Sequence, residues 1–159
     1  DAEDVAKDVE WPTLVFFASL FVMVGALVNT GVIDTLARNA ADAVEGRLGL
    51  ATMALLWGSA ILSAIVDNIP YVAAASPVVA ELVQAEGTSQ GQVLWWALAL
   101  GADLGGNATA VGASANVIVL GLAERSRQRI SFWEFTKYGL IVAAVTVTLA
   151  MPYLWLRYL

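Results

Sequence analysis

The sequence predicts an all-α membrane protein, and three observations lead to this fold class. The chain has 159 residues, of which 59% are hydrophobic, and its mean hydropathy is +0.72. Only 14% of the residues are charged, compared with about 25% in an average soluble protein. Two aspartates, Asp67 and Asp103, interrupt apolar runs long enough to enter a bilayer. An ionisable group at membrane depth is costly, so both positions indicate a functional site.

The composition also excludes several classes of function. Cysteine and histidine are both absent, which rules out disulfides, thiolate catalysis and histidine-based metal or proton chemistry in this chain. The net charge is −6, and the sequence has no basic patch of the kind that nucleic acid requires, so we expect no nucleic-acid partner. Acidic residues cluster in residues 1–10, which we interpret as a solvated leader or the end of a linker.

Residues 11–33 form the first predicted span. This run is uncharged and about 23 residues long, which suffices to cross a hydrocarbon core of about 30 Å. Trp11 suits the membrane interface, and Pro12 suits the first turn of a helix. Residues 34–47 combine charges with apolar positions at helical spacing, which predicts an amphipathic helix on the membrane surface.

Residues 48–84 predict a helical hairpin. The first arm is an apolar run up to Asp67, and the second arm resumes at Tyr71. Both arms are short for a complete span, which favours a re-entrant hairpin with its polar residues at the tip. Pro70 follows the acid closely, and we interpret it as a residue that shapes the backbone there.

Residues 92–123 are too long for one ordinary span and predict a broken helix. Small and polar residues interrupt the middle of this run: Gly101, Asp103, Gly105, Gly106, Asn107, Thr109, Gly112, Ser114 and Asn116. Small residues permit close packing between membrane helices. Amide and hydroxyl side chains instead favour an unwound segment that lines a polar cavity, and this is the interpretation we prefer. It assigns Gly105, Gly106 and Gly112 a backbone-shaping role.

Residues 138–157 form the last predicted span, which aromatic residues close. The preceding segment, residues 124–137, carries Arg125, Arg127, Arg129 and Lys137. Basic loops face the cytoplasm, so we expect this loop and the N-terminus of the segment to be cytoplasmic in a multi-pass protein. Arg38 and Arg47 fall on the opposite side in this orientation.

Two segments resemble the ion transporter superfamily. Residues 104–117, Leu-Gly-Gly-Asn-Ala-Thr-Ala-Val-Gly-Ala-Ser-Ala-Asn-Val, look like its signature, and residues 121–124 and 131–135 extend the similarity. Residues 63–70, Ser-Ala-Ile-Val-Asp-Asn-Ile-Pro, are similar to its re-entrant hairpin tip. The nearest branch of this citrate transporter-like group contains arsenite permeases, sodium/proton antiporters and melanosomal P proteins. The resemblance covers nearly the whole chain from about residue 10.

The resemblance implies a fold and an activity. Members have two inverted repeats, and each repeat contains several spans and one re-entrant hairpin. Substrate and cation lie between the hairpin tips and the unwound helices, and an elevator-like movement gives alternating access. This chain resembles the C-terminal repeat only. We therefore expect half of a secondary active transporter of the plasma membrane, which pairs with an N-terminal repeat and forms a homodimer.

The tip sequence bears on the substrate. In the carboxylate carriers of the superfamily this tip reads Ser-Asn-Thr, whereas here it is Asp67-Asn68-Ile69. An acid at this point repels a dicarboxylate and favours a cation, a proton or a neutral species such as arsenite. No cysteine is available to capture arsenic, so hydroxyl and amide groups would recognise it. The alternatives are a di- or tricarboxylate–sodium symporter and a non-catalytic membrane subunit.

Asp67 and Asp103 admit more than one role. Asp67 is expected to bind sodium, together with Asn68, or to carry a proton, because a carboxylate with nearby carbonyl oxygens suits a hard cation. It could instead cap the second arm of the hairpin. Asp103 is either part of the same site or a cap for the second half of the broken helix. We expect no organic cofactor.

Four further residues are candidate ligands through their side chains or through freed carbonyl groups: Asn107, Thr109, Ser114 and Asn116. A rival hypothesis is an intramembrane aspartyl protease, in which Asp67 and Asp103 share a proton. That chemistry requires Gly-x-Gly-Asp around the second acid, but this chain has Leu100-Gly-Ala-Asp103. We therefore expect a transporter and no enzyme.

Overall fold

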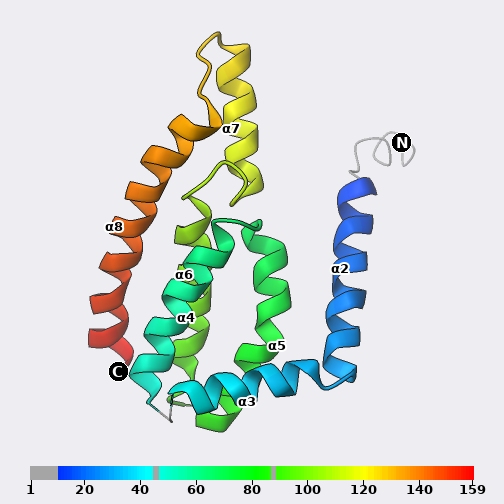
Figure 1. Cartoon of the computed structure of the whole chain (residues 1–159), viewed down its shortest axis with the longest axis vertical. Coiled ribbons are helices and arrows are strands. Elements are labelled where there is room, and N and C mark those ends of the chain that lie inside the picture. Colours follow the sequence, from blue (N-terminus) through cyan, green and yellow to red (C-terminus); the bar gives the residue numbers. More distant parts are fainter. Residues whose placement is uncertain (1–10, 45–46, 87–88) are drawn as a thin grey trace, which may run out of the picture.

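The structure is a computed structural model that describes residues 11–44, 47–86 and 89–159, and every regular element in these ranges is an α-helix (Figure 1). The predicted all-α fold class is confirmed. The acidic segment 1–10 lies outside the described residues. The helices are α2 (Trp11–Asn29), α3 (Val32–Val44), α4 (Leu48–Ser63), α5 (Asn68–Glu86), α6 (Gln92–Gly106), α7 (Ser114–Arg125) and α8 (Phe132–Tyr158).

Helices α2 and α3 meet at a sharp turn. The predicted span 11–33 ends as a helix at Asn29, because Gly31 adopts a φ of +73°, which glycine tolerates and an L side chain rarely does. Helix α3 starts at Val32 and lies across the lower end of the other helices, packed against α5, α2 and α4 (Figure 1). Its position at one end of the bundle suits a helix that rests on a surface.

Helices α4 and α5 form the hairpin, and residues 64–67 connect them. We call this connection the tip. Pro70 lies in the first turn of α5, where its missing N–H has no intrahelical partner to lose. Pro70 thus lies at the start of the second arm, and the interruption of the hairpin precedes it. The arms contain 16 and 19 residues and are thus about 24 and 28 Å long.

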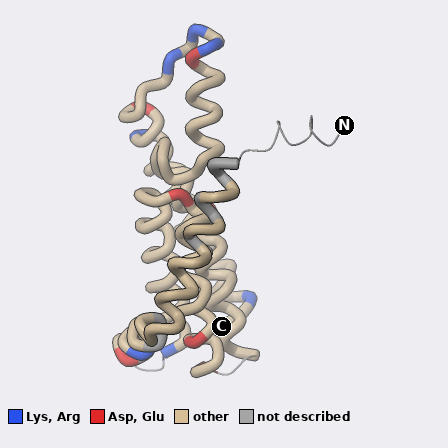
Figure 2. Tube along the Cα trace, turned by 90° about the vertical axis from the view of Figure 1, so that its right-hand side faces the viewer, with Lys and Arg blue, Asp and Glu red and all other residues tan. Residues whose placement is uncertain are grey.

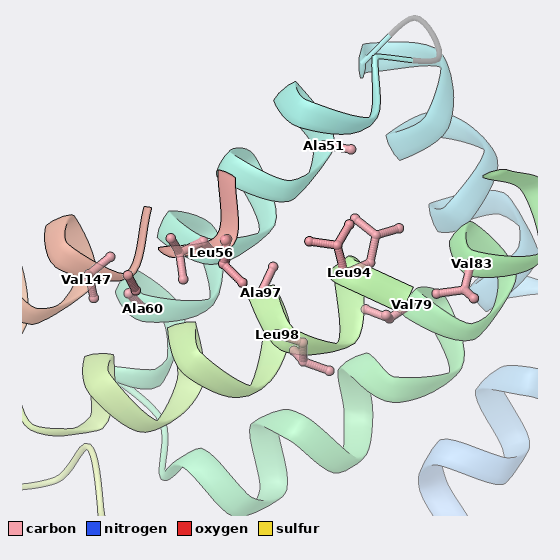
Figure 3. Close-up of a cluster of buried hydrophobic side chains, with 12 residues drawn as sticks. Ala51, Leu56, Ala60, Val79, Val83, Leu94, Ala97, Leu98 and Val147 are labelled. Atoms are coloured by element: carbon pink, nitrogen blue, oxygen red, sulfur yellow. The ribbon is translucent and has the colours of Figure 1, made fainter. Parts of the chain in front are cut away.

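The hydrophobic core lies where α6 packs against α4, with α5 and α8 on its flanks. Leu56 of α4 and Leu94 and Leu98 of α6 belong to this core, which Figure 3 shows, and each is at most 2% exposed. The helices approach closely because α6 has glycine at the contact. A Cβ atom on Gly105 would lie 2.3 Å from the Cα atom of Ala60, and one on Gly101 would lie 2.4 Å from the Leu56 carbonyl oxygen.

The bounds of α6 and α7 correct part of the sequence interpretation. Gly105 and Gly106 belong to helix α6 and are not unwound, and Ser114 and Asn116 already belong to α7. The non-helical segment is therefore residues 107–113, which we call the break. Close packing between helices accounts for Gly101 and Gly105, whereas the unwound segment is confined to residues 107–113. Each of the two interpretations of the small residues thus applies to a different part of the run.

Helix α8 begins six residues before the predicted span 138–157. Ser131 caps it by accepting a hydrogen bond from the backbone N–H of Glu134 at 3.1 Å. By length and composition, α8 is the one helix of the described residues that suffices to cross a membrane; α4 is apolar but shorter. Figure 2 shows that charged residues gather toward the two ends of the molecule, as a membrane protein requires.

Candidate functional site

The tip lies directly against the break, and one backbone and one side-chain hydrogen bond join this part of the hairpin to the break. The N–H of Asn68 donates to the Gly112 carbonyl oxygen at 3.2 Å. The hydroxyl of Thr109 donates to the Ala64 carbonyl oxygen at 2.6 Å. The chain thus places two interrupted helical segments, each with freed backbone groups, at one position midway along the molecule (Figure 1).

Asp67 connects the two segments through its side chain. One carboxylate oxygen accepts a hydrogen bond from the Ile69 N–H at 3.1 Å, which makes Asp67 the N-cap of α5. The other accepts from the Ser114 hydroxyl at 2.5 Å, and Ser114 is the first residue of α7. The carboxylate therefore lies between the N-termini of two helices, whose dipoles stabilise negative charge. The capping role holds, and the same side chain also accepts a hydrogen bond from the start of α7, directly after the break.

Asp103 joins the same cluster from the last turn of α6. Its Oδ1 atom accepts a hydrogen bond from the Asn68 side-chain amide at 3.0 Å. The alternative that Asp103 caps the second half of the broken helix is wrong, because the N-cap of α7 is Ala113 and makes no side-chain cap. Asp67 and Asp103, which are 36 positions apart in the sequence, thus flank one asparagine.

Thr109 and Asn116 hold the break in shape. The Thr109 oxygen also accepts a hydrogen bond from the Gly112 N–H at 3.1 Å. The side-chain amide of Asn116 donates to the carbonyl oxygens of Gly106 and Thr109, both at 2.9 Å. These side chains satisfy the break's own backbone, which a non-helical segment needs at membrane depth.

Asn107 is the candidate that the structure does not bring to the tip. Its amide donates to the Asp103 carbonyl oxygen at 3.4 Å, within α6. The residue lines a different pocket of about 410 Å³, together with Tyr138, Gly139 and Val142 of α8. Asn107 therefore lies on the side of the break that faces α8.

Two glycines allow the break to pass close to its neighbours. A Cβ atom on Gly112 would lie 2.6 Å from the Gly106 carbonyl oxygen and 2.9 Å from that of Ser63. A Cβ atom on Gly106 would lie 2.9 Å from the Gly112 carbonyl oxygen. No other residue fits these positions without a shift of the backbone, so their predicted backbone-shaping role has a steric basis.

Two residues that position the site carry little signal in the sequence. Ser63 is fully buried, and its hydroxyl donates to the Ala102 carbonyl oxygen at 2.6 Å, which ties the end of α4 to α6. A Cβ atom on Gly139 of α8 would lie 2.4 Å from the Asn107 carbonyl oxygen. The position of Ser63 beside the tip is a weak indication in the sequence that it belongs to the site. A single glycine in an apolar helix is common, so the sequence gives no indication that Gly139 contacts the break.

The chemistry of the site is that of oxygen ligands. Asp67 and Asn68 are half-buried, whereas Asp103 and Ser114 are exposed, so the cluster is open on one side. No group of three or more acidic, histidine or cysteine residues suited to a metal occurs among the described residues. Two carboxylates with amide, hydroxyl and carbonyl oxygens are hard oxygen ligands, the kind that hard cations take in proteins.

The sequence profile of the citrate transporter family matches residues 1–101. An uncharacterized transporter of Mycobacterium tuberculosis is 57% identical over 153 residues, which are 96% of this chain and 36% of the relative. The 46 kDa membrane protein of Mycobacterium leprae is 51% identical over an alignment of 160 positions, which covers 100% of this chain and 37% of the relative. No solved structure matches the chain.

The mouse (Mus musculus) P protein is 38% identical over an alignment of 165 positions, which covers 100% of this chain and 20% of that protein. These relatives align through the break, beyond the end of the profile match. The chain spans little more than a third of the length of its mycobacterial relatives. The resemblance of the tip and the break to this superfamily is confirmed, and the chain belongs to the citrate transporter family of membrane proteins.

Proposed function

We propose that this chain forms one half of a secondary active transporter that moves an inorganic ion or small solute, coupled to sodium ions or protons. One observation carries the proposal: the Asp67 carboxylate joins the N-termini of α5 and α7 where the tip meets the break. A cation that binds this carboxylate replaces the hydrogen-bond donors of α5 and α7, and it therefore changes how the two helix N-termini are held together. Cation binding and the geometry of the tip are thus coupled.

Sodium is the cation that the available ligands suit best. Asp67 and Asn68 supply carboxylate and amide oxygens, and the break supplies carbonyl groups close by. Hard cations take such oxygen ligands. A proton would act at the same carboxylate, where it would change the bond to Ser114.

The open side of the cluster supports a role for the remainder of the protein. We propose that an N-terminal inverted repeat covers this side, so that the two tips and two breaks enclose the substrate. The exposure of Asp103 and Ser114, together with the length of the relatives, supports this arrangement. Alternating access by an elevator-like movement and a homodimer are part of the same proposal.

The surface supports membrane residence. Val22 of α2 and Leu149 and Leu156 of α8 are between 65% and 86% exposed, as expected for side chains that contact lipid. We propose a multi-pass protein of the plasma membrane. From α3, helix α2 extends toward the half of the molecule that carries α7 and the loop after it (Figure 1). Arg125, Arg127 and Arg129 lie at the end of α7 and in this loop, and basic loops favour the cytoplasm. This supports a cytoplasmic N-terminal side.

The substrate class follows from charge. With Asp67 at the tip and Asp103 beside it, a dicarboxylate would meet two anions at this half of the site. We propose an inorganic ion or a neutral species such as arsenite, as in an arsenite permease or a sodium/proton antiporter. A carboxylate–sodium symporter requires a second cation to offset these charges. The aspartyl protease hypothesis is not retained, because Asn68 hydrogen-bonds Asp103 and Ser114 hydrogen-bonds Asp67.

The test is transport by the complete protein in proteoliposomes, under sodium and proton gradients, with arsenite and citrate in turn. We expect Asp67→Asn to abolish cation-coupled flux while the protein stays folded, because asparagine keeps the cap but loses the charge. Asp42→Asn, at an exposed position of α3, is the matched control and should leave flux unchanged. Undiminished coupled flux in Asp67→Asn would refute the coupling role, and no flux from the wild-type protein under any gradient would favour a non-catalytic subunit.

A further inference from the structure

A groove of about 320 Å³ runs along α8, beside the tip and the break but apart from the Asp67 cluster. Its walls are almost entirely apolar: Trp57, Ile61, Ile65, Ala108, Leu140 and Ala144 are among the lining residues. Ile61, Ile65 and Leu140 are more than half exposed, so the groove opens on the outer surface of these helices. The groove reaches Ala64 and Thr109, whose hydrogen bond is one of those that join the tip to the break.

The hydroxyl of Thr136 is a polar group in the almost entirely apolar wall of the groove. Thr136 of α8 lines the groove, is only 8% exposed, and its hydroxyl is the one buried side-chain polar atom of the described residues without a hydrogen-bond partner. Leaving a buried hydroxyl without a partner is unfavourable. Threonine in a helix has two accessible χ1 rotamers, so a change of rotamer can present the hydroxyl to the groove. The groove therefore suits an apolar molecule that carries one hydrogen-bond acceptor.

The position of Thr136 along α8 indicates what kind of molecule this is. The exposed aromatic side chains of Trp133 and Tyr153 lie 20 positions apart on α8, which corresponds to about 30 Å, the thickness of the hydrocarbon core. Such aromatic residues mark the two membrane interfaces. Thr136 lies within one turn of Trp133 and thus at the level where the hydrocarbon core meets the lipid head groups.

The groove has the length of one acyl chain. Its wall on α8 extends from Thr136 to Val147, which is about 17 Å, close to the half-thickness of about 15 Å that one lipid chain covers. Lys137 follows Thr136 and is exposed. It shares a helix face with Ala144, which lines the groove, because seven residues make nearly two complete turns. A cation therefore lies at the head-group end of an apolar groove.

We propose that this groove binds one phospholipid of the surrounding bilayer. Its acyl chain lies along Leu140 and Ala144, and its phosphate lies near Lys137. An ester carbonyl oxygen of the lipid accepts a hydrogen bond from the Thr136 hydroxyl. The bound chain packs against Ala64 and Thr109 and so supports the junction of tip and break. The lipid class is an anionic phospholipid, because an exposed lysine at the membrane surface attracts negative head groups.

The test uses the complete protein, purified in detergent and titrated with vesicles of phosphatidylglycerol or phosphatidylcholine. Phosphatidylglycerol should raise the unfolding temperature of the wild-type protein and of Thr136→Ser by similar amounts. Thr136→Val keeps the shape of the side chain and should lose about a fivefold factor in apparent lipid affinity, the value of one hydrogen bond. Without lipid, Thr136→Val should be at least as stable as the wild type, because it removes an unpaired hydroxyl.

Two further variants separate the parts of the proposal. Lys137→Gln should reduce the preference for phosphatidylglycerol over phosphatidylcholine and leave phosphatidylcholine binding unchanged. Ala144→Phe should fill the groove and reduce the phospholipid retained in native mass spectra. Equal lipid affinity in Thr136→Val and the wild type would refute the proposal, as would unchanged retention in Ala144→Phe, which would indicate that another helix of the protein occupies the groove or that lipid binds elsewhere.

Discussion

The contact of α6 with α4 and the junction that follows it are held in two different ways. Leu94 and Leu98 of α6 lie with Leu56 of α4 in one buried apolar cluster, and Gly101 and Gly105 bring the two backbones into contact. Beyond Gly106 helix α6 ends, and hydrogen bonds of Thr109, Ser114 and Asn68 join the break, α7 and α6 to the hairpin. The packed half is thus held by shape, and the junction half by polar groups.

This difference separates the support of the site from its working part. Shape complementarity fails when a side chain grows, because interiors are close-packed and cannot absorb extra atoms. Hydrogen bonds at a half-exposed junction can instead be exchanged for bonds to an ion or to water with a small net change in free energy. The packed half therefore fixes where the tip and the break meet, and the polar half is the part that a ligand can alter.

The largest effect on stability should come from Gly105→Val. The new Cβ atom would lie 2.3 Å from the backbone of Ala60, and neither helix backbone can yield locally. We expect the free energy of unfolding to fall by about 3 kcal/mol or more. Unfolding in SDS titrations measures it.

The control for that change is Gly58→Ala in α4. A Cβ atom at Gly58 would meet no atom within 4 Å, so this variant should retain the wild-type stability or gain slightly. Equal stability of Gly105→Val and Gly58→Ala would show that the α4–α6 contact does not limit the fold.

A smaller effect is expected at the junction from Thr109→Val. The substitution keeps the β-branched shape but leaves the Ala64 carbonyl oxygen without its partner. The Gly112 N–H loses its bond to the Thr109 hydroxyl and keeps only its 3.3 Å bond to the Thr109 carbonyl oxygen. We expect a loss of about 1–3 kcal/mol in the same titration. Faster hydrogen exchange confined to the tip and the break would locate the change.

Thr148→Val is the matched control for Thr109. The Thr148 hydroxyl bonds only to the Ala144 carbonyl within α8 and is exposed, so its loss should be nearly neutral. If both threonine variants lost the same stability, the Thr109 hydroxyl would have no special role in joining the tip to the break.

The smallest effect on stability should come from Ser114→Ala. Ser114 is exposed, and its bond to Asp67 should contribute less than about 1 kcal/mol to folding. If this bond couples the tip to α7, the apparent affinity for the coupling cation should nevertheless change about fivefold. Cation titration of flux in proteoliposomes measures this.

Ser19→Ala provides the control for Ser114. The Ser19 hydroxyl donates to the Val15 carbonyl oxygen within α2, away from the site, and its removal should change neither quantity. A Ser114→Ala protein with wild-type cation dependence would limit the polar junction to a structural role.

Much of the fold was predictable because its signals are local. The uncharged run 11–33, the hairpin 48–84 and the interrupted run 92–123 correspond to helices α2, α4–α5 and α6–α7. Their ends were less predictable. Gly31 ends α2 through a positive φ, and Ser131 starts α8 early through a cap, and each depends on the geometry of a single residue.

Part of the candidate site was likewise predictable from the sequence, and part was not. Residue types alone indicated Asp67 and Asn68, because a carboxylate beside an amide at the end of an apolar run is costly in a bilayer and is typical of a functional site. The residues that hold the site, Ser63 and Gly139, resembled ordinary residues of apolar helices. Their importance depends on contacts with residues distant in the sequence.

The sequence by itself determined that the chain is a helical membrane protein, where its helices are interrupted, and which family it resembles, because apolar run length, helix-breaking residues and polar residues in apolar runs are local properties. Only the tertiary structure decided which polar groups meet. Asp67 pairs with Ser114 47 positions away, and Asn68 pairs with Asp103 35 positions away. The packing of α6 on α4 fixes those pairings, and it does so through glycines whose close contacts no local pattern reveals.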